Sequence, residues 1–249
     1  MPIYKKKRLD QVLVERGLAP SRSQAADLVR RGCVSVNGGP AAKPGALVAP
    51  GADLAVTAEA APYVSRGGLK LAAALDAFAL GPEGRVTLDI GASTGGFTEV
   101  LLARGAARIY ALDVGRGQLH PRLAAESRVI SLEGTDAREL DRAVIPEEVG
   151  AIVADVSFIS LTQALPAALR LAAPGAWLVA LVKPQFEAGR EAVGKGGVVR
   201  AQADRDRALA RVRDFMGQQP GWTVTGEMAS PIRGGSGNEE FLLAGRRDG

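Results

Sequence analysis

The segment DIGASTGGFTEV, residues 89–100, places an acidic residue and three glycines where a predicted strand passes into a helix. A glycine-rich turn lets a small polar ligand lie against bare backbone. A mononucleotide site needs a Lys-Ser/Thr pair after the glycines, and a dinucleotide site needs G-x-G-x-x-G, whereas here Gly91 is next followed by Gly95 and Gly96. The spacing thus favours a third ligand, S-adenosylmethionine, which has no phosphate and carries positive charge on its sulfur and amino group.

Acidic residues after three successive predicted strands agree with that ligand. Asp89 can face the positive charge, and Asp113 in ALDVG is placed to accept hydrogen bonds from both ribose hydroxyls. Asp136 in EGTDAREL follows the next strand and could accept from the adenine amino group. Packing alone does not explain three such residues, so the sequence predicts an S-adenosylmethionine site. Its expected residues are Asp89, Gly91, Ser93, Gly95, Gly96, Phe97, Asp113 and Asp136.

Four further charged residues fall at the same predicted edge although they are far apart in the chain. Asp155 and Lys183 each end a predicted strand. Lys70 begins the helix before the first strand of this region, and Glu240 begins the last strand. Each of them alone is typical of a solvated surface side chain. Together they predict a cluster of alternating charge beside the methyl donor.

The elements that must position these residues alternate between helix and strand from residue 66 onward. Apolar patterns predict helices over 69–80, 95–105, 161–172 and 203–216, and strands over 85–91, 108–115, 151–157 and 176–184. Segments 223–231 and 239–245 are expected to form a closing antiparallel pair. The predicted fold class is α/β, a Rossmann-like class I methyltransferase fold with a mostly parallel sheet, an antiparallel last strand and a small α+β module in front.

Composition places the chain among ordinary globular proteins. Its 249 residues are 47% apolar and 23% charged. The longest apolar runs fall short of the roughly 18 residues that a membrane span needs, and no apolar segment follows the basic start as it would in a secretion signal. One cysteine and one histidine exclude an internal disulfide and a zinc cluster. The sequence predicts a cytoplasmic protein without a membrane span and without a metal.

Positive charge gathers at the front of the chain. Residues 1–60 hold nine Lys or Arg against five Asp or Glu, whereas residues 61–249 hold 22 of each, so the formal net charge of +4 lies wholly in the first part. A module that binds a polyanion and a solvated basic face both explain this asymmetry. We place the boundary between two domains, 1–60 and 61–249, in a short linker near residue 60.

The front module has a pattern of two short helices and short strands. RLDQVLVERGL predicts a helix that stops at Gly17, and SRSQAADLVRRG predicts a second helix with Ser21 and Gln24 at capping-box spacing. CVSVNGGP and GALVAPGADLAV add short strands and a turn. This order resembles an S4-type RNA-binding domain. The resemblance implies phosphate contacts from basic side chains, and the expected RNA-binding residues are Lys5, Lys6, Lys7, Arg8, Arg22, Arg30, Arg31 and Arg66.

Five motifs of the larger domain resemble, in order, those of the FtsJ-like ribose methyltransferases and, within them, the TlyA or hemolysin A-like family. They are RGGLKL, DIGASTGGFT, VADVSFISL, LVKPQFEAGREAVGKGGVV and SGNEEFLL. The resemblance implies that the four charged residues form the family's Lys-Asp-Lys-Glu tetrad, namely Lys70, Asp155, Lys183 and Glu240. Glu239 is the alternative to Glu240, which we choose because the family pattern is Gly-Asn-x-Glu-aromatic.

The same resemblance implies methyl transfer from S-adenosylmethionine to the 2′-hydroxyl of a cytidine in ribosomal RNA, either as RNA or in an assembled subunit. Lys183 would take or polarise the hydroxyl proton. The last residues, GRRDG, follow soon after the last strand, which favours 23S rRNA over an additional 16S target. Two other functions stay open: a membrane-active hemolysin, and an RNA-binding ribosome-assembly factor without catalysis.

The remaining features receive mainly structural interpretations. Segment 187–200 has four glycines and one lysine and no apolar periodicity, and it is predicted to be a mobile loop that closes on RNA, with an inert loop as the alternative. Phe97 and Phe158 are expected in the core, with base-stacking platforms as the alternative, and Cys33 is expected as a small buried side chain rather than a reactive thiol. His120 is expected to be an exposed structural residue.

Overall fold

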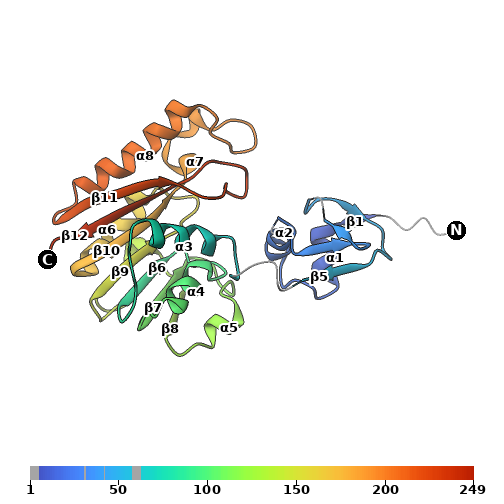
Figure 1. The fold of residues 1–249 in the computed structure, drawn as a ribbon, viewed down its shortest axis with the longest axis horizontal. Coiled ribbons are helices and arrows are strands. Elements are labelled where there is room, and N and C mark those ends of the chain that lie inside the picture. The colour runs from blue at the N-terminus through green and yellow to red at the C-terminus, as the bar shows by residue number, and fades with distance from the viewer. Residues whose placement is uncertain (1–5, 31, 42, 58–62) are drawn as a thin grey trace. The chain divides into compact units, whose positions relative to one another are not determined.

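The computed structural model describes residues 6–30, 32–41, 43–57 and 63–249. Contacts divide the chain into two compact units, Met1–Arg66 and Gly67–Gly249 (Figure 1). The division falls after Arg66, six residues beyond the boundary that the sequence predicts. The expected boundary itself lies outside the described residues, as do Lys5 and Arg31.

The first unit is a small α+β module. Its elements are β1 (Lys7–Arg8), α1 (Leu9–Glu15), α2 (Arg22–Arg30), β2 (Val34–Val36), β3 (Gly39–Pro40), β4 (Leu47–Val48) and β5 (Leu54–Val56). The strands form a three-stranded antiparallel sheet of order β3-β2-β5 and a two-stranded pair of β1 with β4. Both predicted helices and the predicted short strands are present. Strand β1 was not expected, because its two basic residues carry no apolar pattern.

Local sequence explains these elements. Helix α1 buries Leu9 and Leu13 completely, at the spacing of one helix face. Helix α2 begins after Ser21, whose Oγ accepts a hydrogen bond from the backbone N–H of Gln24 at 3.3 Å, as the capping-box spacing predicts. Between β2 and β3 the chain turns at Asn37 with a positive φ of 51°, a conformation that asparagine tolerates better than most residues.

The second unit is built on a seven-stranded sheet. Its strands are β6 (Val86–Ile90), β7 (Arg108–Asp113), β8 (Val129–Glu133), β9 (Val149–Ala154), β10 (Ala172–Val182), β11 (Trp222–Ala229) and β12 (Phe241–Arg247), in the order β11-β12-β10-β9-β6-β7-β8. Strand β12 is antiparallel to both of its neighbours, and the pairs from β10 to β8 are parallel. The predicted fold class, with its closing antiparallel pair, is confirmed.

Helices cover both faces of this sheet (Figure 1). They are α3 (Gly67–Ala77), α4 (Gly96–Ala103), α5 (Pro121–Ala124), α6 (Leu161–Leu171), α7 (Pro184–Glu187) and α8 (Gln202–Gly217), with short 3-10 helices η2 (Ala137–Glu139) and η3 (Arg190–Ala192). Helix α3 packs with α4, while α6 packs with α8 and against β9 and β10. Because the central strand β9 is covered on both faces, its segment Ala151–Ala154 is wholly apolar and fully buried.

Strand register determines which residues meet at the carboxyl edge of the sheet. Asp155 follows β9 and Lys183 follows β10, two neighbouring parallel strands. Strand β12 runs the other way, and its first residue Phe241 pairs with Val182, the last residue of β10. Glu240, which precedes β12, is therefore brought to the same edge as Lys183. The reversed last strand lets a residue near the end of the chain join a site built on parallel strands.

Two expectations from composition concern spans and ions. Among the described residues, every helix is too short or too polar to cross a bilayer. In that same part of the chain, His, Cys, Asp and Glu side chains form no group of three that could hold a metal ion. Cys33 is 2% exposed, so the predicted buried cysteine is confirmed.

Candidate functional site

The first part of the site is an ion pair between the residues that follow β9 and β10. Lys183 Nζ lies 2.7 Å from Asp155 Oδ1, and it donates a hydrogen bond to Ser157 Oγ at 2.8 Å. The Lys183 side chain is 12% exposed and that of Asp155 23%. The ammonium group is thus held by an ion pair and a hydrogen bond to one loop and keeps a small opening to solvent. Ser157 was not expected from the sequence.

The second part is a more deeply buried ion pair between α3 and the start of β12. Lys70 Nζ lies 2.5 Å from Glu240 Oε2, and the two side chains are 8% and 3% exposed. Gly234 lies directly against the Glu240 carboxylate, because an ideal Cβ at Gly234 would come too close to Glu240 Oε1 for any side chain. The four predicted residues therefore come together as two ion pairs, each with one lysine and one carboxylate.

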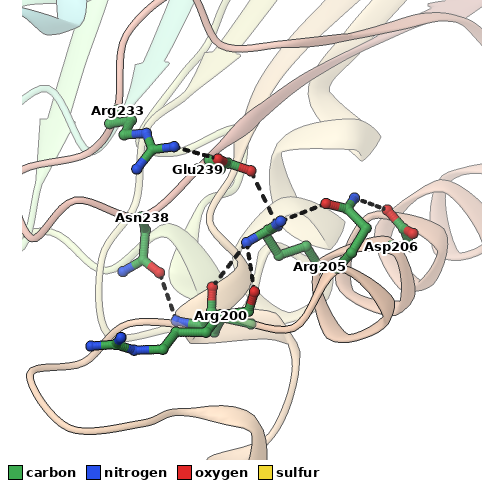
Figure 2. Close-up of polar contacts among 8 residues, drawn as sticks. Arg200, Arg205, Asp206, Arg233, Asn238 and Glu239 are labelled. Atoms are coloured by element: carbon green, nitrogen blue, oxygen red, sulfur yellow. Dashed lines mark hydrogen bonds and ion pairs between the residues drawn. The ribbon is translucent and has the colours of Figure 1, made fainter.

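The structure distinguishes Glu240 from its neighbour Glu239. Figure 2 shows Glu239 directed toward two arginines, with Oε1 at 2.6 Å from Arg233 Nη2 and Oε2 at 3.2 Å from Arg205 Nε. Glu239 is 39% exposed, whereas Glu240 is buried against Lys70. Alternation along an extended chain explains why two adjacent carboxylates face different partners.

The segment 187–200, predicted as a mobile loop, is anchored near both ends. Glu187 belongs to α7 and is 2% exposed. At the other end, the buried Asn238 side chain accepts a hydrogen bond from the N–H of Val199 at 2.9 Å and donates one to the carbonyl of Gly197 at 2.8 Å. Figure 2 shows Asn238 beside the segment that Arg205 also contacts. Polar side chains therefore anchor both ends of the segment, and a mobile loop that closes on RNA stays a prediction.

The glycines of the turn between β6 and α4 are required by neighbouring atoms. Gly91 has a φ of 84°, and an ideal Cβ there would lie 2.6 Å from the backbone oxygen of Asp155. Gly95 has a φ of 97°, and its missing Cβ would collide with Leu119 and Leu123. The sequence explained these glycines by ligand approach alone. The structure adds that Gly91 lets the loop that follows β9 approach the turn.

Asp89 lies in the core beneath this region rather than on its surface. Its side chain is fully buried, and Oδ2 accepts a hydrogen bond from Thr98 Oγ1 of α4 at 2.6 Å. Oδ1 is also buried and accepts no hydrogen bond from any residue that the structure describes. Burial raises the pKa of Asp89 to about 7, the Thr98 hydrogen bond opposes this shift, and the negative charge of Asp155 adds to it. Ionised Asp89 below the turn therefore destabilises the folded state.

Asp113, at the end of β7, is connected to the glycine turn. Its Oδ2 accepts from the N–H of Ser93 at 2.8 Å and its Oδ1 from that of Gly115 at 2.7 Å. Ser93 has a φ of 48°, a left-handed conformation that is rare for residues other than glycine. The carboxylate is partly exposed, so it keeps free lone pairs toward solvent.

Acidic residues after β8 also shape the edge. Asp136 accepts from the N–H of Arg138 at the start of η2 and forms an ion pair with its guanidinium at 2.6 Å, which lowers the pKa of Asp136. Glu133 accepts hydrogen bonds from three successive backbone N–H groups, at residues 117–119, and these bonds lower its pKa. Glu133 was missed because a carboxylate at a strand end gives no sign of which loop it holds.

Of the two core predictions for phenylalanines, one is confirmed and one is wrong. Phe97 is 3% exposed, so its placement in the core is confirmed. Phe158 is 93% exposed with a φ of 66°, so the core prediction for it is wrong. The left-handed backbone after Asp155 turns this side chain outward, where its ring lies 5.3 Å from that of Phe186. His120 is half-buried rather than exposed, since its Nδ1 accepts from the N–H of Arg122 and begins α5.

Several of the predicted RNA-binding residues have partners in the first unit. Arg8 and Arg22 both contact Asp10, at 2.8 and 3.3 Å, and Asp10 is only 4% exposed. Lys7 pairs with Glu15, and Arg66 lies 3.6 Å from Asp27. The Arg8 and Arg22 side chains stay about half exposed. The buried Asp10 therefore holds these two guanidinium groups in fixed places on the surface. Lys6 and Arg30 are also exposed.

Sequence reasoning missed the polar residues that hold the site from behind. Ser157, Asn238, Thr98 and Glu187 each bond a site residue or its loop, and three of them are buried. A polar residue within an otherwise apolar or glycine-rich stretch is the one signal that they share. That signal does not identify the partner, which depends on the tertiary structure.

Comparison with known proteins agrees with this arrangement. Residues 63–247 match the FtsJ-like methyltransferase family and residues 7–54 match the S4 domain. The 16S/23S rRNA (cytidine-2′-O)-methyltransferase TlyA of Mycobacterium tuberculosis is 49% identical over 237 residues, covering 95% of this chain and 88% of the relative. The 23S rRNA (cytidine-2′-O)-methyltransferase TlyA of Campylobacter jejuni is 37% identical over 188 residues, covering 72% and 69%. A solved structure from Streptococcus thermophilus, named as a hemolysin, has a TM-score of 0.75 at 42% identity and covers 98% of this chain and 90% of its own.

The buried Asp89 gives a prediction about pH and stability. The folded chain protonates this carboxyl as the pH falls through about 7, whereas the unfolded chain does so only near 3.8. Between these two pH values the folded state therefore binds more protons at Asp89 than the unfolded state does. As a result, the contribution of Asp89 to the free energy of unfolding becomes less favourable as the pH rises toward 7. We expect the melting temperature of Asp89→Asn to rise relative to that of the parent protein as the pH increases from 5 to 8.

Asp136→Asn is the matched control, because its ion pair lowers rather than raises the pKa. Its melting temperature should not gain on the parent over the same pH range. A difference between Asp89→Asn and the parent that is independent of pH would show that Asp89 is not a destabilised buried carboxylate.

Proposed function

Because the chain belongs to the FtsJ-like methyltransferase family and carries an S4 domain, we propose that it transfers a methyl group from S-adenosylmethionine to the 2′-hydroxyl of a cytidine in ribosomal RNA. The observation that carries this proposal is the pairing of Lys183 with Asp155 and of Lys70 with Glu240 at one sheet edge. The names of the two TlyA relatives supply cytidine as the target, and both name 23S rRNA, which we take as the first substrate to test.

The residues around the glycine turn fit the methyl donor. Asp113 keeps a partly exposed carboxylate at a strand end, suited to two vicinal ribose hydroxyls. The orphaned Oδ1 of Asp89 supplies negative potential below the turn, where a cationic sulfonium or amino group would offset its burial. When bound, S-adenosylmethionine supplies an electrophilic methyl group. Asp89, Asp113 and Asp136 would hold it with the backbone of the turn.

Lys183 is the residue we assign to the hydroxyl. A ribose 2′-hydroxyl is a poor nucleophile until its proton is removed or strongly polarised. Lys183 Nζ is held by Asp155 and Ser157 and retains a small opening to solvent, so it can contact a group placed in that opening. As the oxygen–methyl bond forms, the sulfur–methyl bond of the donor breaks and the sulfur leaves as a neutral thioether. The hydroxyl proton passes to solvent through Lys183, whose ammonium group gives up one proton as it takes the other, and Asp155 keeps that group in place.

The Lys70–Glu240 pair has a different task. It is almost closed to solvent, and removal of either partner would leave an uncompensated buried charge, at about 3–5 kcal/mol. The pair therefore fixes the start of β12 against α3. Because Phe241 pairs with Val182, this pair lies at the same edge of the sheet as Lys183.

Phe158 offers a surface for the target base. An apolar ring that is 93% exposed, held by an unusual backbone conformation and backed by Phe186, is a stacking platform rather than a packing residue. It lies three residues after Asp155, so a base stacked there would bring its own ribose toward Lys183. This placement agrees with a target nucleotide taken out of its helix.

The non-catalytic assembly factor is the competing function. It would share the S4 domain and the donor site, so RNA binding does not separate the two functions. The paired tetrad favours catalysis, because a protein that only binds RNA needs no lysine held by two acceptors at the donor edge. Donor binding without methyl transfer to any ribosomal RNA would support the assembly factor.

The first prediction of this function concerns Lys183. Lys183→Ala should lower the turnover of methyl transfer by at least about 100-fold, since proton transfer contributes about 10²–10⁴ to a rate. Binding of S-adenosylmethionine and of RNA should persist. Methyl transfer is measured on 23S rRNA with a labelled donor. Arg170→Ala, which removes an exposed positive charge from α6, is the control and should keep normal turnover. Near-normal turnover of Lys183→Ala would make the lysine structural.

A second prediction concerns Phe158. Stacking of one base on an aromatic ring contributes about 1–3 kcal/mol, so Phe158→Ala should raise the KM for RNA by about 5- to 150-fold. Phe158→Tyr keeps the ring and should stay close to the parent protein. The KM for S-adenosylmethionine should not change in either variant. If the alanine and tyrosine variants have the same KM for RNA, the ring does not contact the base.

A third prediction concerns the basic front unit. Substitution of Arg22, Arg30 and Arg31 by Ala removes up to three phosphate contacts, so the slope of log affinity against log salt should become shallower by about 2–3. A triple change of Arg170, Arg207 and Arg213 to Ala removes equal charge from the exposed surface of the second unit. This control should keep the parent slope. Equal slopes for both triple variants would mean that RNA is held outside the S4 module.

A further inference from the structure

Two short segments of the site are joined by three contacts in order along the chain. Segment 155–160 follows β9, and segment 183–187 follows β10 and includes α7. Lys183 contacts Asp155 and Ser157, the ring of Phe186 lies 5.3 Å from that of Phe158, and Glu187 contacts Ser160. The first contact involves the reacting lysine and the second the exposed ring. The third contact is deeply buried, and nothing in the proposed chemistry uses it.

The Glu187 carboxylate is fully engaged in this third contact. Its Oε2 accepts a hydrogen bond from Ser160 Oγ at 2.5 Å, and its Oε1 accepts one from the backbone N–H of Leu161 at 2.8 Å. Glu187 is 2% exposed and Ser160 8%. The carboxylate thus sits at the beginning of α6, where the helix dipole favours negative charge. Arg211 of α8 donates to the Glu187 carbonyl at 3.1 Å and fixes the backbone as well.

Capping of α6 does not by itself account for this carboxylate. Ser160 is already the N-cap residue, and its Oγ accepts from the N–H of Thr162 at 3.2 Å. A second acceptor brought from another element carries a desolvation penalty, and burial does raise the pKa of Glu187. The additional effect of this residue is a link between two loops. Only three residues lie between it and Lys183, and only one residue lies between Ser160 and Phe158.

We propose that Glu187 is a positioning residue for the methyl transfer: by fastening α7 to the start of α6, it holds Lys183 against Asp155 and Ser157 and keeps Phe158 turned outward. The inference rests on the proposed function, because it assigns Glu187 to the placing of Lys183. It explains why a buried carboxylate lies between the two loops that carry these residues. Glu187 itself is buried away from substrate and acts through its neighbours.

The test compares Glu187→Ala with Glu187→Gln and with a control. Glutamine has the same shape, and its amide can accept from the N–H of Leu161 and donate to Ser160 Oγ. Glu147→Ala is the matched control, since Glu147 accepts from Tyr110 Oη and Arg108 at 2.7 Å each and precedes β9 at the other end of the strand. Each variant is measured for melting temperature, kcat, the two KM values and hydrogen exchange of residues 155–161.

We expect Glu187→Ala to lower kcat by at least tenfold and to speed exchange in residues 155–161, with the KM for S-adenosylmethionine unchanged. Glu187→Gln should recover most of kcat and of the protection. Glu147→Ala should lose stability without a comparable change in kcat. Should Glu187→Ala not fold, Ser160→Ala removes the same contact from the other side and is expected to lower kcat in the same way.

The inference is overturned if Glu187→Ala, or Ser160→Ala in its place, keeps the kcat of Glu147→Ala. It is also overturned if exchange in residues 155–161 stays at the parent level. These outcomes are separable from failure of the proposed function, which is decided by the turnover of Lys183→Ala. The exchange measurement tests the link between the two loops even if Lys183 proves dispensable.

Discussion

A lysine ammonium group that is taken from water needs a carboxylate partner, and this requirement governs the whole carboxyl edge of the sheet. Lys70 has Glu240, and Lys183 has Asp155 with Ser157. The four residues come from α3 and from the ends of three neighbouring strands, so the two pairs share one edge only when β9, β10 and β12 lie side by side. The reversed direction of β12 is essential, because it brings a residue that precedes a strand to the edge where the other strands end.

Support for this edge comes from polar and glycine residues rather than from a larger apolar core. Gly91 lets the loop after β9 approach the turn after β6, and Gly234 leaves room for the Glu240 carboxylate. Asn238 ties the segment before Val199 to the turn before β12, and Glu187 ties α7 to α6. These contacts cost desolvation, and the destabilised carboxyl of Asp89 adds to that cost. The gain is a fixed geometry around a lysine that keeps a small opening to solvent.

The sequence predicted most of the architecture, because alternating apolar runs are long and strongly periodic in the second unit. It also predicted that the four charged residues lie at one edge, since charged residues that end buried strands are few and their edge follows from the fold class. Their catalytic role stays a prediction. It failed for Phe158, because apolar character alone does not reveal that a left-handed backbone turns the ring outward. It could not find Ser157, Glu187 or Asn238, whose partners lie on other elements. The two-residue strand β1 was likewise missed, since its pairing with β4 is a tertiary contact.

The position of the transferred methyl group is the most direct test that this edge serves a ribose hydroxyl. The purified chain is incubated with labelled S-adenosylmethionine and unmodified 23S rRNA or large subunits, and the product nucleosides are separated by mass spectrometry after complete digestion. If the edge with the two ion pairs serves a ribose hydroxyl, the label appears in 2′-O-methylcytidine. No label is transferred when the target cytidine carries a 2′-deoxyribose. Label on a base, or label that persists on the 2′-deoxy target, would contradict the assignment of Lys183 to a ribose hydroxyl.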